Sequence, residues 1–343
     1  MKTYYIGADV HCNSTDMAIE YRRQIIERVT VPTTITALRQ VLEKFPGKKH
    51  FAIEESTLAG WIYRHLYPHV DQLIVSDPRR NHLIARDGDK DDPIDAVKLA
   101  QLLRGGYLRA VHHSRDDQRI ALKQWVNLYH QRVAQRTAQI NRIRAQARAY
   151  GREIPSVVFN DPAQRQAWLR DQQLPQLAEL LNLLWIGWEA ADQQVQLAER
   201  RLRQFTRCDP IIKQWMKLPE IAHIRALTIL AYLDTPFRFK TKSHLWKYCG
   251  IGLERQTSGT DKKGRPKPAR LQMPRRRNGR LKSVLLTAAS HMTISHNPFS
   301  QHYERMIAHG ISPANARHTI ARKLITVMWG MWKNHTPYDP QRV

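Results

Sequence analysis

Four carboxylates in this sequence stand where they could bind metal ions together. Asp9 follows the apolar part of TYYIGADVH, Glu54 ends the apolar run HFAIE, and the stretch DGDKDDPIDAVKLAQLL concentrates five acids in nine residues. Hard divalent cations bind clustered oxygen ligands from several chain segments. Two such ions about 3.5 to 4 Å apart would clamp the attacking and leaving oxygens of a phosphodiester. The candidate metal ligands and catalytic residues are Asp9, Glu54, Asp92 and Asp95.

The same acids also have a structural interpretation. Asp92 precedes Pro93, which favours the first helical position, so Asp92 is a natural N-cap and Asp95 lies three residues later. Many capped helices carry this pattern, yet residues three apart share one helix face and can point at one site. Glu55 competes with Glu54 as a ligand. Strand alternation points these two in opposite directions, and we expect Glu54 to face the site.

These acids need a scaffold that brings distant segments together. Residues with period-two alternation predict strands, and apolar residues at helical spacing predict helices between them. Strands are predicted at 3–11, 14–21, 25–31, 50–54 and 71–77, and helices at 34–45, 58–66 and from 92 onward. The order βββαβαβ, followed by a helix, predicts an α/β sheet with helices on its faces.

The charge of the chain is unevenly distributed. The formal net charge is +25 over 343 residues, but residues 1–111 carry 16 Lys and Arg against 14 Asp and Glu. Nearly all of the excess therefore lies in the rest of the chain. Such an excess fits a polyanionic partner whose counterions are released on contact, and nucleic acid is the leading candidate.

A basic segment near the C-terminus is the strongest sign of this partner. Ten Lys or Arg and no acid lie between Lys262 and Lys282, so the segment would repel itself without a polyanion across it. Just before it, Ser258 lies in the turn-like sequence QTSGT, where a serine is usually only a turn residue. The candidate nucleic-acid contacts here are Lys262, Lys263, Arg265, Lys267, Arg270, Arg275, Arg276, Arg277 and Arg280.

Between the two charged regions, the sequence predicts two long helices. Apolar residues repeat with four-three spacing from Leu122 to Tyr150, interrupted by Arg136, and again from Leu177 to Phe205. The pattern predicts coiled-coil helices, which form either an intramolecular hairpin or a dimer seam. The first helix also carries arginines, including Arg142 and Arg148, that favour contacts with phosphates over a merely solvated face.

Cysteine usage and hydropathy indicate the compartment. The three cysteines, Cys12, Cys208 and Cys249, are scattered and fit neither a disulfide framework nor a zinc site, which indicates a reducing cytosol. No apolar leader precedes the first charged residues, and the most apolar run, from Leu180 to Trp188, is too short to span a bilayer. We expect a protein that is neither secreted nor embedded in a membrane.

Several motifs in order resemble one known family, the DEDD transposases of bacterial insertion sequences, which include pilin-gene invertases and bridge-RNA-guided recombinases. YYIGADVH resembles the family's first-strand Asp motif, AIEES its Glu motif, and KDDPIDAVKLA its Lys-Thr-Asp-x-x-Asp-Ala signature, with Asp91 in place of Thr. KYCGIGLERQTSG, RNGRLKSVLLTAA and ARKLITVMWGMWKNHTPYD resemble its C-terminal motifs. The sequence departs at LPEIAHIRA, where Glu220 and Ala222 replace two glycines of the family's Pro-Gly-Ile-Gly.

The resemblance implies a fold and a chemistry. It implies an RNase H-like domain of the RuvC type at 1–110, a helical coiled-coil region at 111–215 and a mainly helical transposase domain at 216–343. Asp9, Glu54, Asp92 and Asp95 would hold Mg²⁺ or Mn²⁺. Ser258 would be the nucleophile that forms a covalent phosphoserine link to DNA, and it would need activation because serine is a weak nucleophile near neutral pH.

The resemblance also implies partners. They are double-stranded donor and target DNA, a non-coding bridge RNA, and further copies of the chain in a dimer or tetramer, acting in the bacterial cytoplasm at the nucleoid. Two other classes remain open from the residues themselves. A RuvC-like structure-specific nuclease would need the acids but use water, and a non-catalytic nucleic-acid-binding protein would need only the basic surface.

Overall fold

A computed structural model of the chain describes residues 1–80, 92–256 and 270–342. It divides the chain into two compact units, Met1–Asp117 and Gln118–Val343. Each unit has its own hydrophobic core, and each is described by itself below. The predicted further division of the second unit at residue 215 stays a prediction.

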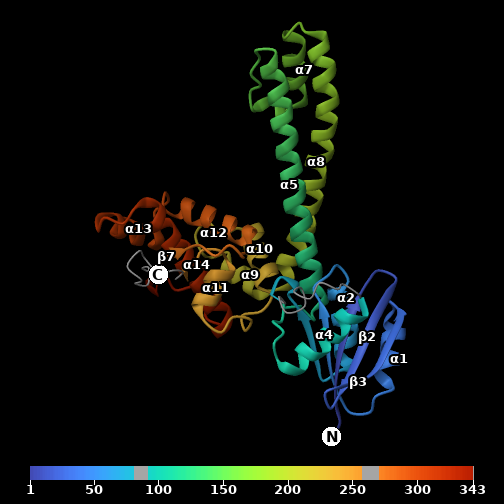
Figure 1. The fold of residues 1–343 in the computed structure, drawn as a ribbon. Coiled ribbons are helices and arrows are strands. Elements are labelled where there is room, and N and C mark those ends of the chain that lie inside the picture. Colours follow the sequence, from blue (N-terminus) through green and yellow to red (C-terminus); the bar gives the residue numbers. More distant parts are fainter. Residues whose placement is uncertain (81–91, 257–269, 343) are drawn as a thin grey trace, which may run out of the picture. The chain divides into compact units, whose positions relative to one another are not determined.

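The first unit is built on a five-stranded sheet (Figure 1). Its strands, in the spatial order β3-β2-β1-β4-β5, are β1 (Thr3–Val10), β2 (Ser14–Tyr21), β3 (Gln24–Pro32), β4 (Lys48–Glu54) and β5 (Gln72–Ser76). The first three strands form an antiparallel meander, whereas β4 pairs parallel to β1 and β5 parallel to β4. The α/β prediction is confirmed for this unit, and the sheet is compatible with an RNase H-like domain.

Helices cover both faces of this sheet. On one face α1 (Ile35–Glu43), which Thr34 caps, and α2 (Ala59–Leu66) bury Leu38 and Ile62 against Ile6 and the rest of a large apolar core. On the other face lies α4 (Asp92–Gly105), whose Leu99 and Leu103 pack with Ala52. Short 3-10 turns at Tyr67–His69 and Pro78–Arg80 complete the connections. Alternate residues of β1 therefore face different helices.

Gly7 sets how closely α4 lies on the sheet. A Cβ atom at this position would lie 2.2 Å from the carbonyl oxygen of Ala96 and 2.5 Å from the backbone nitrogen of Ala100. No other residue fits without moving α4 away from β1. The glycine thus brings the helix backbone into direct contact with the first strand.

The second unit begins with a helical hairpin. The long helices α5 (Asp117–Ala149) and α8 (Pro175–Cys208) lie side by side in Figure 1, and the short helices α6 (Val157–Asn160) and α7 (Pro162–Asp171) close its tip. Ile143 and Ala147 of α5 share a small core with Leu181 and Trp185 of α8. The helical prediction is confirmed and the observed partner is intramolecular, while supercoiling and a second partner in a dimer stay predictions.

The remaining elements form the mainly helical part of this unit. They are α9 (Pro210–Trp215), α10 (His223–Leu233), α11 (Lys242–Tyr248), β6 (Glu254–Gln256), β7 (Arg270–Gln272), α12 (Gly279–Met292), α13 (Pro298–Ala308), α14 (Pro313–Asn334) and the 3-10 turn Pro340–Arg342. Their core includes Leu227, Leu285 and Met328, and it extends to Val126 of α5 and Leu202 of α8. The base of the hairpin is thus built into this core. Within the described ranges, no helix combines the length and apolarity that crossing a membrane requires.

Candidate active site

The ends of β1 and β4 bring two of the predicted ligands together. The last paired residues of these parallel strands are Ala8 and Ile53, so Asp9 and Glu54 are the next residues along each strand. Asp9 shares its face with Gly7, two residues earlier, and Glu54 shares its face with Ala52. Both Gly7 and Ala52 contact α4. The two carboxylates therefore lie at the same edge of the sheet, on the α4 face.

The first turn of α4 lies over this edge. Gly7 touches the middle of α4 at Ala96 and Ala100, while Arg104 at its C-terminal end pairs with Glu20, which lies opposite Tyr5 near the start of β1. The helix thus runs against the direction of β1, and its N-terminal turn, which contains Asp95, lies toward Asp9. Asp92 is the first helical residue. The side chain of Asp92 lies outside the described part of the chain.

The structure separates Glu54 from its competitor Glu55. Glu54 is the last residue of β4 and is half-buried on the α4 face. The Glu55 backbone N–H donates to the carbonyl of Ser76, and its side chain lies 2.7 Å from Nε2 of His113. The geometry favours Glu54 as the residue at the site and gives Glu55 a separate partner.

Asp16 is an acid at this edge that the sequence analysis missed. It lies directly opposite Asp9 in the antiparallel pair of β1 and β2, so the two side chains share a face. Its carboxylate accepts a hydrogen bond from the hydroxyl of Thr30, and the Asp9 carboxylate lies 3.2 Å from Nε2 of His11. The alternation in STDMAIEY could have identified it, since Asp16 and Glu20 share a phase.

Carboxylate groups from two strands and a helix lie on this side of the sheet, and carboxylate oxygens are the ligands that hard divalent cations prefer. Among the side chains that the structure describes, no three His, Cys, Asp or Glu residues are grouped closely enough to hold a metal ion. The carboxylate of Asp92, the fourth predicted ligand, is not among the side chains searched. Asp9, Glu54 and Asp95 are the described residues that would contribute to a site.

The basic segment falls largely outside the described residues. This applies to Ser258, the predicted nucleophile, which follows β6 by two positions, and to the side chain of Arg270 in β7. It applies equally to Lys262, Lys263, Arg265 and Lys267.

The described basic residues of this segment differ in burial. Arg275, Arg276 and Arg277 are exposed. Arg277 donates to the carbonyl of Pro274 at 2.8 Å, and its side chain covers Gly250, where a Cβ atom would lie 2.7 Å from its Cδ. Arg280 is half-buried, and its charge acts on Tyr232. Arg277 and Arg280 therefore have protein surroundings that the sequence did not reveal.

Arg280 also acts on a histidine of α5. His130 is half-buried with Nε2 at 3.0 Å from the hydroxyl of Thr228 in α10. Burial, followed by the positive charge of Arg280, lowers the pKa of His130 to about 4. His130 is thus a neutral hydrogen-bonding residue at pH 7, and it ties α5 to α10.

The arginines of the hairpin also divide by their contacts. Arg142 and Arg148, the predicted phosphate contacts of α5, are exposed. Arg136, which interrupts the apolar repeat, pairs with Asp192 of α8 at 2.7 Å. At this position, an ion pair between the two helices therefore replaces the apolar contact that the repeat predicts.

The turn that departs from the family's glycine pattern has an unusual backbone. Glu220 adopts a φ of 58°, in the left-handed region that favours glycine. Arg225 donates to the Glu220 carbonyl and lies 3.5 Å from its carboxylate, and His291 lies 3.5 Å from the same carboxylate. Ala222 precedes α10 without a side-chain cap. The turn keeps a glycine-like conformation at Glu220, held by these contacts.

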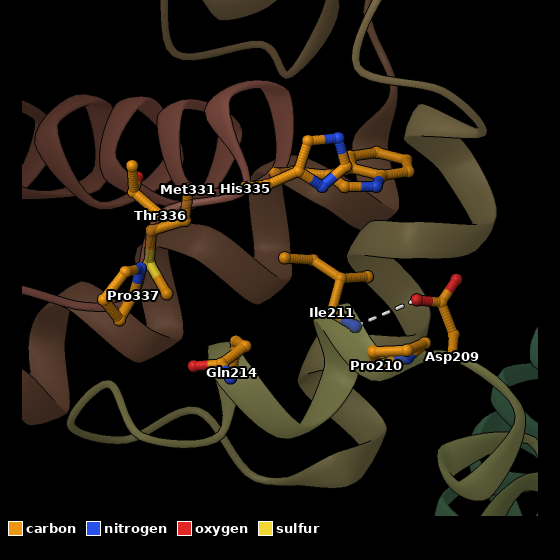
Figure 2. A pocket seen from close by; sticks show the side chains of 9 residues that line it. Asp209, Pro210, Ile211, Gln214, Met331, His335, Thr336 and Pro337 are labelled. Carbon is orange, nitrogen blue, oxygen red and sulfur yellow. Dashed lines mark hydrogen bonds between the residues drawn. The ribbon is translucent and has the colours of Figure 1, made fainter.

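A cavity of about 340 Å³ lies elsewhere in the second unit, between α9 and the end of α14 (Figure 2). Its lining is mainly apolar and includes Ile211 and Met331. The one carboxylate drawn there, Asp209, accepts from the Ile211 backbone N–H at 2.9 Å and pairs with Arg119. This acid caps a helix, and among the described residues no predicted site residue lines the cavity.

Comparison with protein families agrees with this arrangement. Residues 6–151, which run from β1 past the end of α5, match a model for DEDD transposases of the IS110 type, so the chain is a transposase. Residues 213–304 match the transposase IS116/IS110/IS902 family. The chain belongs to this family of insertion-sequence transposases. A comparison with curated proteins found no match.

Proposed function

We propose that this transposase cuts and rejoins DNA strands with Mg²⁺ held by Asp9, Glu54, Asp92 and Asp95, and with Ser258 as the nucleophile. The observation that carries the proposal is the placement of Asp9 and Glu54 side by side on parallel strands, beneath the helix that begins at Asp92. When bound, the metal would neutralise charge on the phosphodiester and favour loss of the serine proton. Mn²⁺ would serve the same ligands.

Strand exchange without ATP requires that the energy of the broken bond be kept. The Ser258 oxygen would form a bond to phosphorus while the bond from phosphorus to a deoxyribose oxygen breaks, and the serine proton would end on the released sugar oxygen. A sugar hydroxyl of the new strand would then attack the phosphoserine, form the new phosphodiester and return the proton to Ser258. The phosphorus keeps two ester bonds at every stage, so each step exchanges one phosphodiester for another and is close to energetically neutral.

The experiment is to trap this intermediate. A nicked suicide substrate should leave protein covalently joined to DNA on a denaturing gel, and peptide mapping should place the phosphate on Ser258. Ser258→Ala should lose the adduct but keep its DNA affinity. Cleavage by both proteins without any adduct would instead identify a RuvC-like nuclease that uses water. An adduct on Thr257 or Thr260 would keep the recombinase but reject Ser258.

Donor and target duplex DNA and a non-coding bridge RNA are the partners that we propose, acting in the bacterial cytoplasm at the nucleoid. The support is the basic second half of the chain, which suits polyanions. Sequencing of RNA that copurifies with the protein tests the guide, and recovery of no discrete RNA species would reject it.

We further propose that the chain acts as a dimer or tetramer. The support is a set of apolar side chains that stay exposed on α8, among them Leu183 (69% exposed) and Ile186 (64% exposed). Light scattering should give a mass above that of one chain. Leu183→Glu with Ile186→Glu should lower this mass, and Gln193→Glu with Gln194→Glu, which adds the same charge at exposed positions of α8, should not.

A further inference from the structure

A group of basic side chains on α12, α13 and α14 lacks acidic partners. Helices α12 and α14 contain no Asp or Glu, and α13 contains only Glu304. The cations of the group are Lys282 of α12, Arg305 of α13, and Arg317, Arg322 and Lys323 of α14. Within the described residues, none of these five cations forms a salt bridge. We call them the α12–α14 basic cluster.

Packing brings the cluster together from three helices. Helix α14 packs against both α12 and α13. Burial, then the charges of Lys282, Arg322 and Arg317, lowers the pKa of His318 of α14. Burial, then the charges of Lys323 and Arg305, lowers the pKa of His302 of α13. Three cations thus gather around His318 and the other two around His302, and Arg322 and Lys323 are consecutive residues of α14.

The protein holds one member of the cluster in a fixed orientation. The Arg322 guanidinium donates through Nε to the carbonyl of His318 at 3.3 Å and through Nη2 to the hydroxyl of Thr319 at 3.1 Å. It lies 6.0 Å from the ring centre of Trp246, whose Nε1 donates to Thr326. In the described part of the chain, Nη1 of Arg322 has no protein partner. The protein therefore already orients the Arg322 guanidinium group so that it can donate a hydrogen bond to an acceptor on a bound molecule.

Holding like charges together costs free energy, because partly buried cations repel and are poorly hydrated. Burial lowers the pKa of both Arg322 and Lys323, and Arg305 adds to the effect on Lys323. A bound polyanion would relieve this repulsion. A nucleic-acid backbone carries one phosphate charge about every 1.7 Å of duplex axis, which suits cations spread over three helices.

We propose that the α12–α14 basic cluster is a nucleic-acid-binding surface that contacts the phosphodiester backbone of DNA or RNA and that shares only Lys282 with the basic segment at 262–282. The inference rests on the proposed function, because a transposase supplies the nucleic acid. Contacts to phosphate are independent of sequence, so the surface would position the bound strand and leave its sequence unread.

The test compares two double variants of the full chain. Arg305→Gln with Lys323→Gln removes two charges from the cluster. Arg39→Gln with Lys44→Gln removes two charges from exposed side chains of the first unit that already pair with Glu43 and Glu27. Fluorescence anisotropy with a labelled 30-base-pair duplex and with a 30-nucleotide RNA should be recorded over a range of NaCl concentrations.

We expect the cluster variant to lower the salt slope of log affinity by about 0.9 per lost contact on duplex DNA, or about 0.7 on single-stranded RNA. The control variant should keep the wild-type slope. The nucleic acid, DNA or RNA, whose salt slope changes more is the one that the cluster binds. Arg305→Lys with Lys323→Arg keeps both positive charges and should give the wild-type salt slope. Wild-type slopes for the cluster variant in both arms would overturn the proposal and leave an acidic protein as the partner.

The outcome is independent of the chemistry proposed for Ser258. Ser258→Ala should keep the salt slope and lose the covalent adduct, whereas the cluster variant should form the adduct at saturating DNA. A missing adduct in the wild-type protein, with the slope change present, would reject the proposed function and retain this surface.

Discussion

Asp9 and Glu54 end neighbouring parallel strands at the same level, because Ala8 and Ile53 are the last residues that pair between β1 and β4. Their carboxylates share the face on which α4 lies, and carboxylate oxygens from separate chain segments are ligands that hard divalent cations prefer. This donor chemistry suits a bound metal ion. The first two predictions follow from it.

Removal of a single acid should abolish cleavage and leave DNA binding intact. Asp95→Ala should lose strand cleavage by at least about a hundredfold, in line with the loss of a group that stabilises developing charge, and should keep duplex affinity in an electrophoretic mobility assay. EDTA should have the same effect on the wild-type protein, reversed by excess Mg²⁺. Recombination at the normal rate by Asp95→Ala, or in EDTA, would refute the metal assignment.

Glu54 and Glu55 should respond differently to the same change. Glu54→Gln removes a negative charge beside Asp9 and should abolish cleavage. Glu55→Gln can still accept a hydrogen bond from His113 and should keep most of the activity. The neighbouring residue thus serves as the matched control. Loss of cleavage in Glu55→Gln alone would move the ligand by one position.

At position 220, in the turn before α10, glycine should give a more stable protein than alanine. The left-handed φ of 58° at Glu220 is strained for any residue with a Cβ atom. Glu220→Gly and Glu220→Ala both lose the carboxylate contacts with Arg225 and His291 and keep the backbone carbonyl, so their difference in stability isolates the cost of the backbone conformation. The glycine variant should be more stable than the alanine variant by about 1 kcal/mol in urea unfolding. Equal stabilities would show that the turn relaxes on substitution.

His130 should make the free energy of unfolding decrease as the pH falls below 6.5. Its pKa of about 4 in the folded protein lies below its ordinary value of 6.5, so its contribution to stability is complete above pH 6.5 and is lost as the pH falls toward 4. His130→Gln can still hydrogen bond to Thr228. Between pH 7 and pH 5, the free energy of unfolding should fall by about 1 kcal/mol less in this variant than in the wild-type protein, after allowance for the partial exposure of His130. Parallel curves for the two proteins would show that His130 does not titrate in this range.

Much of the first unit could be predicted because its signals are local. Period-two alternation identified the meander of the first three strands, short apolar runs identified β4 and β5, and Thr34 before an apolar helical repeat marked the start of α1. The spacing from Leu177 to Leu202 likewise identified the buried face of α8. Each of these patterns depends on residues within one turn or a few strand positions of each other.

Contacts between distant segments were not predictable in this way. The proximity of Arg280 and Tyr232, the Glu55–His113 pair and the position of Asp16 opposite Asp9 all depend on tertiary packing or strand register. Arg280 was predicted to contact nucleic acid, and the structure places it half-buried. A basic composition indicates a polyanionic partner, but only packing shows which basic side chains are available to contact it.

The helical hairpin has apolar anchors at both of its ends. Val126 and Leu202 join the large core at the base, and Ile143 and Trp185 belong to the small core at the tip. The stretch between them is therefore a spacer whose length can change in matched seven-residue steps in α5 and α8, with the facing seam kept in phase. Each step alters the reach of the arm by about 10 Å, so one scaffold could be fitted to partners of different span.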